Sequence, residues 1–317
     1  MLYAPQPMHI PDGFLSTLVS IVLWVLSAVS VAYALRRVSQ DLGERQVPLM
    51  GVLAAAIFAG QMLNFTVAGG TSGHLMGAAL ATILLGPWAA LIVMTTVVGI
   101  QAVIFQDGGL LALGANIFNM GVIGVAVSHF VYTSIQKLAR SAKWGIFVGG
   151  FVAAWMSIVV SALAVALQLA LSGTSPANIA VPAMGGIHML IGLGEGLITL
   201  GALAFLYAAR RDLLHSGEAA PKGNVAVWVG GLVFALLLAV LSPLASAHPD
   251  GLEWVAEQKG FLDAAQEPLY HIIPDYVFPG ISNEALATIV AGLLGTLMVF
   301  GVALGVAYLR RERTAGR

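Results

Sequence analysis

The 317-residue chain contains no cysteine. This absence excludes disulfide bonds, thiolate metal ligands and a cysteine nucleophile, so a site for a soft metal has to use histidine, methionine or backbone atoms. The sequence also lacks a Gly-x-x-x-x-Gly-Lys-Ser/Thr motif and a His-Glu-x-x-His motif. The chain therefore carries no P-loop ATPase of its own, and a zinc-dependent intramembrane protease is disfavoured.

Charge is scarce as well. Charged residues make up 9% of the chain, whereas a soluble globular protein has roughly 25%. Hydrophobic residues make up 59%, and the mean hydropathy is +0.91. The net charge of −1 gives no indication of nucleic-acid binding. We expect an all-α, polytopic integral membrane helical bundle, surrounded by lipid.

The apolar runs and the basic residues predict a topology. A crossing needs about 20 apolar residues, and suitable runs are 14–35, 47–65, 74–105, 109–136, 144–171, 185–209, 225–244 and 285–309. Thirteen of the 14 Lys and Arg residues lie within 36–45, 137–143, 210–222 and 310–317, which we place in the cytoplasm. This arrangement requires 74–105 to cross twice, turning at Gly86-Pro87, unless its first part is a re-entrant segment. It predicts about nine transmembrane helices in the cell inner (plasma) membrane, with the N-terminus outside and the C-terminus inside.

Three histidines fall on the predicted outer side. His9 precedes the first run, His74 follows a Gly-rich loop and is expected to open a helix, and His188 is expected to open the helix 185–209. Thr71 or Ser72 is a plausible N-cap for the helix at His74. Imidazole suits late first-row divalent metals, so this side of the membrane is a candidate metal site.

His9 directly follows Met8, which could itself be a translation start. The α-amine of Met8, the backbone nitrogen of His9 and the His9 ring would then form fused chelate rings. A fourth nitrogen would complete a square, which is the preference of Ni(II) and Cu(II). On these residues alone, an ordinary loop histidine is the alternative.

Polar residues within the apolar runs form a second group of candidates. Glu195 is an acidic residue well inside a run, where a carboxylate suggests function or a hydrogen-bonded structural role. It lies seven residues after His188, so both face the same way. Asp107 reads as part of an outer turn. Asn116 could orient the outer loops or hydrogen-bond between helices.

A boundary is expected near 216–224, which divides the chain into a unit of residues 1–215 and a unit of residues 216–317. The second unit would contain two crossings joined by an outer loop of about forty residues, 245–284. This loop contains seven acidic residues, which could attract cations or simply be solvated: Asp250, Glu253, Glu257, Asp263, Glu267, Asp275 and Glu284.

Several motifs occur together in a fixed order and carry a family resemblance. They are Met8-His9-Ile10-Pro11-Asp12-Gly13-Phe14-Leu15, the run from Asn64 to Leu75, Asp107-Gly108-Gly109-Leu110, the run from Gly114 to Gly121, and His188 to Gly196. Residues 8–210 resemble the CbiM/NikM family, the substrate-specific membrane subunits of energy-coupling-factor transporters for cobalt and nickel. Pro249-Asp250-Gly251-Leu252-Glu253 is similar to the small two-crossing N component (NikN/CbiN), here fused.

The resemblance implies that Ni²⁺ or Co²⁺ is a transported substrate, bound by Met8, His9 and His74. It implies as partners a transmembrane coupling subunit and cytoplasmic ATPase subunits. The chain departs from the family in the extension Met1–Pro7, which leaves Met8 without a free amine, so we expect the mature chain to start at Met8. We take as residues beside the metal or on its path Asp12, Asn64, Ser72, Asp107, Asn116, His188 and Glu195.

Two other functions fit the residues. An autonomous secondary divalent-cation transporter or channel could use Glu195 as a relay. A membrane enzyme with a His-bound metal would need activated water, but no second carboxylate or nucleophile accompanies the histidines, so we expect no enzyme. The sequence does not distinguish nickel from cobalt.

Overall fold

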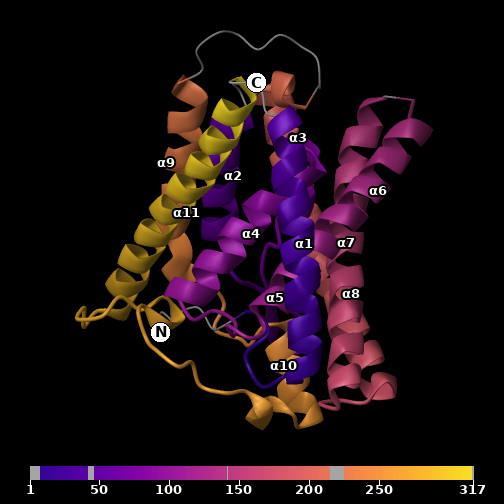
Figure 1. The fold of residues 1–317 in the computed structure, drawn as a ribbon, viewed down its shortest axis with the longest axis vertical. Coiled ribbons are helices and arrows are strands. Elements are labelled where there is room, and N and C mark those ends of the chain that lie inside the picture. Colours follow the sequence, from indigo (N-terminus) through magenta and orange to yellow (C-terminus); the bar gives the residue numbers. More distant parts are fainter. Residues whose placement is uncertain (1–7, 42–45, 141, 215–224, 316–317) are drawn as a thin grey trace.

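The structure is a computed structural model that describes residues 8–41, 46–140, 142–214 and 225–315. It is a bundle of helices with one small hairpin, and the outer loop of the second unit lies beneath it (Figure 1). The helices are α1 (Thr17–Asp41), α2 (Gln46–Gln61), α3 (Ala78–Leu85), α4 (Pro87–Ile104), α5 (Leu113–Asn116), α6 (Gly124–Leu138), α7 (Lys143–Ser172), α8 (Ala177–Ala209), α9 (Val225–Leu241), α10 (Gly251–Lys259) and α11 (Glu284–Ala315). A π-helix, η1 (Ile117–Ile123), joins α5 to α6, and the strands are β1 (Phe65–Val67) and β2 (Thr71–Gly73).

Within the described residues, six helical segments are long and apolar enough to cross a membrane. They are Thr17–Val38, Pro87–Ile104, Leu113–Leu138, Lys143–Ser172, Ala177–Ala209 and Glu284–Arg311. The segments Gln46–Gln61 and Trp228–Leu244 are apolar but shorter. The protein is therefore a multi-pass membrane protein, as the composition predicts.

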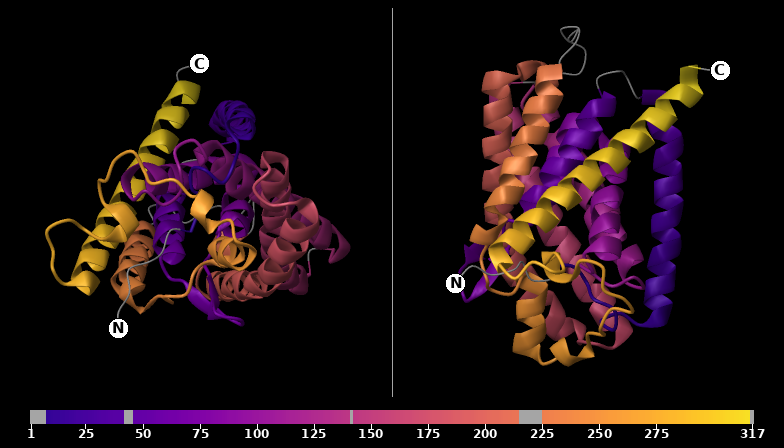
Figure 2. Two further views of the ribbon diagram at one scale, coloured as in Figure 1. Left: turned by 90° about the horizontal axis from the view of Figure 1, so that it is seen from below. Right: turned by 90° about the vertical axis from the view of Figure 1, so that its left-hand side faces the viewer.

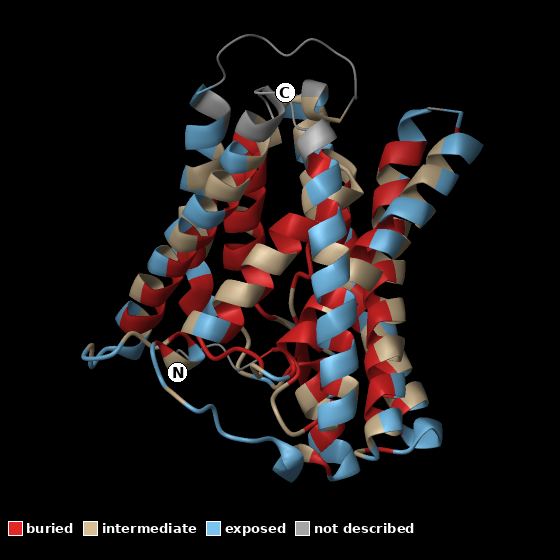
Figure 3. Ribbon diagram, viewed as in Figure 1, coloured by how far each residue is buried: buried red, intermediate tan, exposed pale blue. Residues whose placement is uncertain are grey.

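The outer helices present apolar side chains to the surroundings. On α1, Leu18, Val25 and Val29 are exposed, and Figure 3 shows exposed residues along the length of this helix. The opposite face packs closely on α5, because a Cβ at Gly114 would lie 2.5 Å from the Trp24 backbone. An apolar exposed face is the pattern of a helix that contacts lipid.

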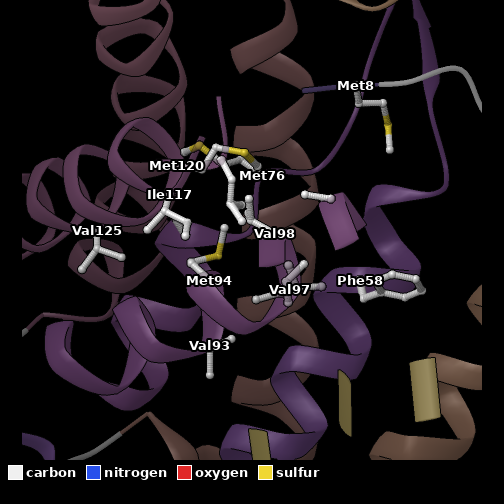
Figure 4. Close-up of a cluster of buried hydrophobic side chains, with 14 of the residues drawn as sticks. Met8, Phe58, Met76, Val93, Met94, Val97, Val98, Ile117, Met120 and Val125 are labelled. Carbon is white, nitrogen blue, oxygen red and sulfur yellow. The ribbon is translucent and has the colours of Figure 1, made fainter. Parts of the chain in front are cut away.

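The centre of the bundle contains apolar side chains from α2, α4 and η1. Met76, Met94 and Met120 lie close together there (Figure 4), and all three are buried. Flexible methionine side chains fill irregular space between helices. A buried polar pair also lies between α2 and α4: Gln101 Nε2 donates to Gln61 Oε1 at 2.8 Å.

The region 74–105 breaks where the sequence predicts, but it does not form two full-length helices. Gly86 has φ +80° and Pro87 begins α4. The preceding helix, α3, has only eight residues, or about 12 Å at 1.5 Å per residue. Residues Gly73–Gly77 before it are not helical. The polypeptide thus enters the bundle as an extended segment, which is tolerated at such depth only where protein surrounds it.

Two expected helix starts are wrong. Ser72 is not an N-cap, because β1 and β2 form an antiparallel hairpin that pairs Phe65 with Gly73, and α3 begins after Gly77. His188 does not open a helix either, since α8 begins at Ala177, eleven residues earlier. The backbones of the two strands hydrogen-bond to each other. In β2 the backbone N–H of Ser72 also donates to the Pro249 carbonyl of the second unit.

Helices α9 and α11 of the second unit pack against α2 of the first. Helix α11 packs along α2 and crosses the bundle obliquely, with α9 beside it (Figure 2). The chain between these helices passes under the lower end of the bundle and includes α10. The predicted boundary at 216–224 lies outside the described residues.

Candidate metal site

The three predicted outer histidines line one cavity. This cavity has a volume of about 100 Å³ and is lined in part by Gly251 and Leu252 of α10; α10 lies at the lower end of the bundle (Figure 1). Its polar lining residues are His9, His74, Asn116, Asn119, Ser161, His188 and Asp250. Residues from both units therefore contribute to one site.

Two nitrogens of the N-terminal segment converge on a single oxygen atom. The backbone N–H of Met8 donates to Asp107 Oδ1 at 2.7 Å, and His9 Nδ1 lies 3.0 Å from the same oxygen. Both His9 and Asp107 are buried. Gly108 makes this approach feasible, because a Cβ there would lie 2.9 Å from the His9 Cβ. Two of the expected ligand nitrogens are thus already directed to one point.

The rings of His9 and His74 lie edge to face, with centroids 5.9 Å apart. Nδ1 of His74 lies 3.1 Å from the Leu75 carbonyl oxygen. Because a carbonyl only accepts, this nitrogen carries the proton and Nε2 keeps its lone pair. In His9, Nε2 is buried and has no hydrogen-bond partner. Buried polar atoms without partners are rare.

His9 and Asp107 each shift the pKa of the other toward its charged form. Burial opposes protonation of His9, but the Asp107 carboxylate outweighs burial and raises the pKa of the ring. Burial likewise opposes ionisation of Asp107, but the imidazolium and the hydrogen bonds to this carboxyl lower its pKa. At Asp250, burial raises the pKa to about 7. Asp107, whose pKa is lowered, therefore lies beside His9, and Asp250, whose pKa is raised to about 7, lines the cavity.

Asn116 and Asp12 fix the segment that carries His9. Asn116 Oδ1 accepts from the Ile10 N–H at 3.0 Å, and its Nδ2 donates to the Ile10 carbonyl at 3.1 Å. Asp12 Oδ1 accepts from the Ala112 N–H at 2.9 Å. These bonds hold the backbone that carries His9 against α5 and the residue before it.

Ser72 and Asn64 contact the second unit and lie away from the two rings. Ser72 Oγ donates to the His248 carbonyl at 2.8 Å, and the backbone N–H of Ser72 donates to the Pro249 carbonyl at 2.8 Å. The Asn64 carbonyl accepts from the Ser246 N–H at 2.8 Å, while its buried amide side chain has no partner. These two residues hold the outer loop against the hairpin.

His188 and Glu195 occupy different surroundings, although both lie on α8. His188 lines the cavity, and its Nδ1 donates to the Met184 carbonyl at 2.8 Å. Glu195 accepts backbone N–H bonds from Met76 at 2.7 Å and from Gly77 at 3.0 Å. Its carboxylate therefore fixes the extended segment immediately after His74.

Side chains alone do not provide a full set of ligands. Across the described parts of the chain, no three His, Cys, Asp or Glu side chains gather closely enough to hold a metal ion. A cation at the point between His9 and His74 would therefore need backbone or terminal nitrogens as well, which is the chemistry expected of Met8-His9.

Two residues of the site were not predicted from the sequence. Asp250 belongs to the acidic loop and enters the cavity because it caps α10, accepting from the Glu253 N–H at 2.7 Å. Tyr276 donates to Asp107 Oδ2 at 2.5 Å and is fully buried. The five-residue motif at 249–253 was a signal for Asp250. No local pattern marks Tyr276.

Two family models match successive parts of the chain. The family model CbiM, described as the cobalt uptake substrate-specific transmembrane region, matches residues 9–213. The PDGLE domain matches residues 225–312.

Full-length relatives and a solved structure agree with this assignment. "Putative fused nickel transport protein NikMN" of Archaeoglobus fulgidus is 38% identical over 97% of this chain and 100% of its own length. The fused nickel transport protein NikMN of Rhodobacter capsulatus is 30% identical over 98% of this chain and 100% of its own. The crystal structure of a truncated transition metal transporter is 34% identical and superposes with a TM-score of 0.57, covering 63% of this chain and 99% of that one.

Replacing Glu195 by Gln should destabilise the segment that carries His74. The amide retains one acceptor oxygen but presents a donor to the other backbone N–H, so a loss of about 1–3 kcal/mol is expected. Thermal unfolding in detergent measures it. Thr199→Val is the control, because Thr199 lies one turn further along α8 and its buried hydroxyl has no partner. Equal stability of Glu195→Gln and the unsubstituted chain would contradict the prediction.

Proposed function

The chain belongs to the CbiM family of cobalt uptake substrate-specific transmembrane regions and continues into a PDGLE domain. From this premise we propose that it captures Ni²⁺ or Co²⁺ as the substrate-specific subunit of an ATP-driven energy-coupling-factor importer. The metal ion is the transported substrate. The unit of residues 1–215 binds it, and the unit of residues 216–317 supports this site from outside.

The convergence of Met8 and His9 on Asp107 Oδ1 is the observation that carries the proposal. Nδ1 is the ring nitrogen that closes a six-membered chelate with the backbone nitrogen of its own residue, and it is the nitrogen directed to this point. The nitrogen of Met8 faces the same oxygen. Nε2 of His74 supplies the fourth nitrogen from the neighbouring ring. A metal ion would take the place of the carboxylate oxygen, in the planar nitrogen coordination that Ni(II) prefers.

We propose that the chain crosses the membrane nine times. One crossing consists of residues 74–85, an extended stretch followed by α3. The basic ends of α1, α8 and α11 lie at the end of the bundle opposite α10 (Figure 1). The rule that basic loops stay in the cytoplasm then puts the C-terminus inside and the cavity outside the plasma membrane.

Partner subunits supply the energy in this proposal. The chain has no P-loop motif, so it requires cytoplasmic ATPases and a transmembrane coupling subunit. The alternative, an autonomous transporter with Glu195 as a relay, needs a carboxylate with a free oxygen. Each oxygen of Glu195 accepts a backbone N–H instead. We therefore propose the importer subunit alone.

Replacing His9 or His74 by Ala should abolish high-affinity metal binding while the protein still inserts. Loss of groups around a metal ligand costs roughly 10–100-fold in affinity, and loss of a ligand should cost at least about 100-fold. Calorimetric titration with Ni²⁺ and Co²⁺ on the purified protein measures this. His129→Ala is the control, because His129 is exposed on α6. Unchanged binding by both variants would refute the proposed ligands.

The purified, metal-binding protein should begin at Met8, because the four-nitrogen set requires a free amine there. Residues 1–7 lie outside the described part of the chain. Intact mass and N-terminal sequencing measure where the recovered chain starts. Retention of Met1–Pro7 on protein that binds nickel tightly would eliminate the amine as a ligand.

Liposomes that contain this chain alone should accumulate no metal, whereas addition of the coupling and ATPase subunits with ATP should restore uptake. Radioactive nickel measures the accumulation, and His9→Ala in the complete complex is the control. Sustained uptake by the chain alone would instead favour the autonomous transporter.

A further inference from the structure

Tyr276 belongs to the second unit, but its hydroxyl contacts Asp107 of the proposed metal site. Its hydroxyl donates to Asp107 Oδ2 at 2.5 Å, while Oδ1 of the same carboxylate holds Met8 and His9. The two oxygens of one side chain therefore join the outer loop of the second unit to two expected ligand nitrogens. Among the described residues, Tyr276 provides the side-chain hydroxyl that donates to Asp107 Oδ2.

The backbone around Tyr276 is shaped to deliver the phenol to this point. Asp275 and Tyr276 have φ values of +53° and +58°, a region that residues other than glycine seldom adopt. The neighbouring backbone is anchored on the end of α4, because Ile273 and Asp275 donate their N–H groups to the carbonyls of Ile104 and Phe105 at 3.0 and 3.2 Å. Such backbone conformations cluster at functional sites.

The ring of Tyr276 is held independently of its hydroxyl. It stacks on Phe105 with centroids 4.8 Å apart and an interplanar angle of 15°. The centroid of the Phe58 ring lies 6.1 Å from that of Tyr276 and 5.4 Å from that of Phe105, so the three rings form one cluster. A phenylalanine at this position would keep these contacts, so loss of the hydroxyl can be separated from loss of packing.

We infer that Tyr276 is a positioning residue for the metal site and acts through Asp107. The inference rests on the proposed function. With Oδ2 anchored, Oδ1 holds the nitrogen of Met8 and Nδ1 of His9 directed at one point, the position that a chelated ion would take. Preorganised ligands bind more tightly because less ordering accompanies binding. The carboxylate also stays beside the site as a negative charge when the dication replaces its oxygen. The second unit thereby tunes metal affinity at the site of the first.

The test compares Tyr276→Phe with Tyr270→Phe in the full chain as recovered from the membrane. Tyr270 lies in the same outer loop, and its hydroxyl donates to the Val103 carbonyl at 2.9 Å, away from the site. Titration with Ni²⁺ should show affinity roughly tenfold weaker for Tyr276→Phe, with unchanged stoichiometry. Tyr270→Phe should bind like the unsubstituted chain.

A double-mutant cycle separates positioning from a general structural role. In an Asp107→Asn background, Tyr276→Phe should cause no further loss of nickel affinity, because its path to the ligands is already broken. A loss of equal size in both backgrounds would overturn the inference, and so would wild-type affinity of the single variant. If the unsubstituted chain itself binds neither Ni²⁺ nor Co²⁺, the proposed function fails instead.

Discussion

The carboxylate of Asp107 is the interaction on which the site depends. Its Oδ1 accepts from the backbone of Met8 and from the ring of His9, and its Oδ2 accepts from Tyr276. Two of these groups come from the start of the chain, and the third comes from the outer loop of the second unit. Burial makes a carboxylate costly unless hydrogen bonds and an opposite charge compensate it, so the surrounding loops are constrained to supply those partners.

The loops around Asp107 are held by backbone hydrogen bonds that reach across the sequence. Asn116 bonds both backbone groups of Ile10, Ser72 bonds the backbone at His248 and Pro249, and Glu195 bonds the chain after His74. Each bond fixes a segment that carries or covers a histidine. Residues first considered for metal chemistry thus serve to position the backbone, which explains why polar side chains occur so deep in an apolar protein.

The long membrane-spanning helices were predictable from the sequence, whereas the short elements between them were not. Long apolar runs are visible in the sequence because a crossing helix must satisfy its own backbone and face lipid. The runs at 14–35, 144–171 and 285–309 therefore correspond closely to α1, α7 and α11. The start of α3 was harder to predict, since this helix begins only after Gly77, within a run that reads as continuous from residue 74. The hairpin was not predicted because three-residue strands have no detectable period.

The sequence by itself determined the class of protein, the family, the break at Gly86 and the two histidines that approach each other. Composition, run length and ordered motifs are local properties, so they are legible without coordinates. Only the tertiary structure decided that Glu195 fixes a backbone segment, that Asp250 enters the cavity, and that Tyr276 reaches Asp107. The Glu195 and Tyr276 contacts join residues 119 and 169 positions apart along the chain, and such contacts arise when helices pack and leave no trace in local periodicity.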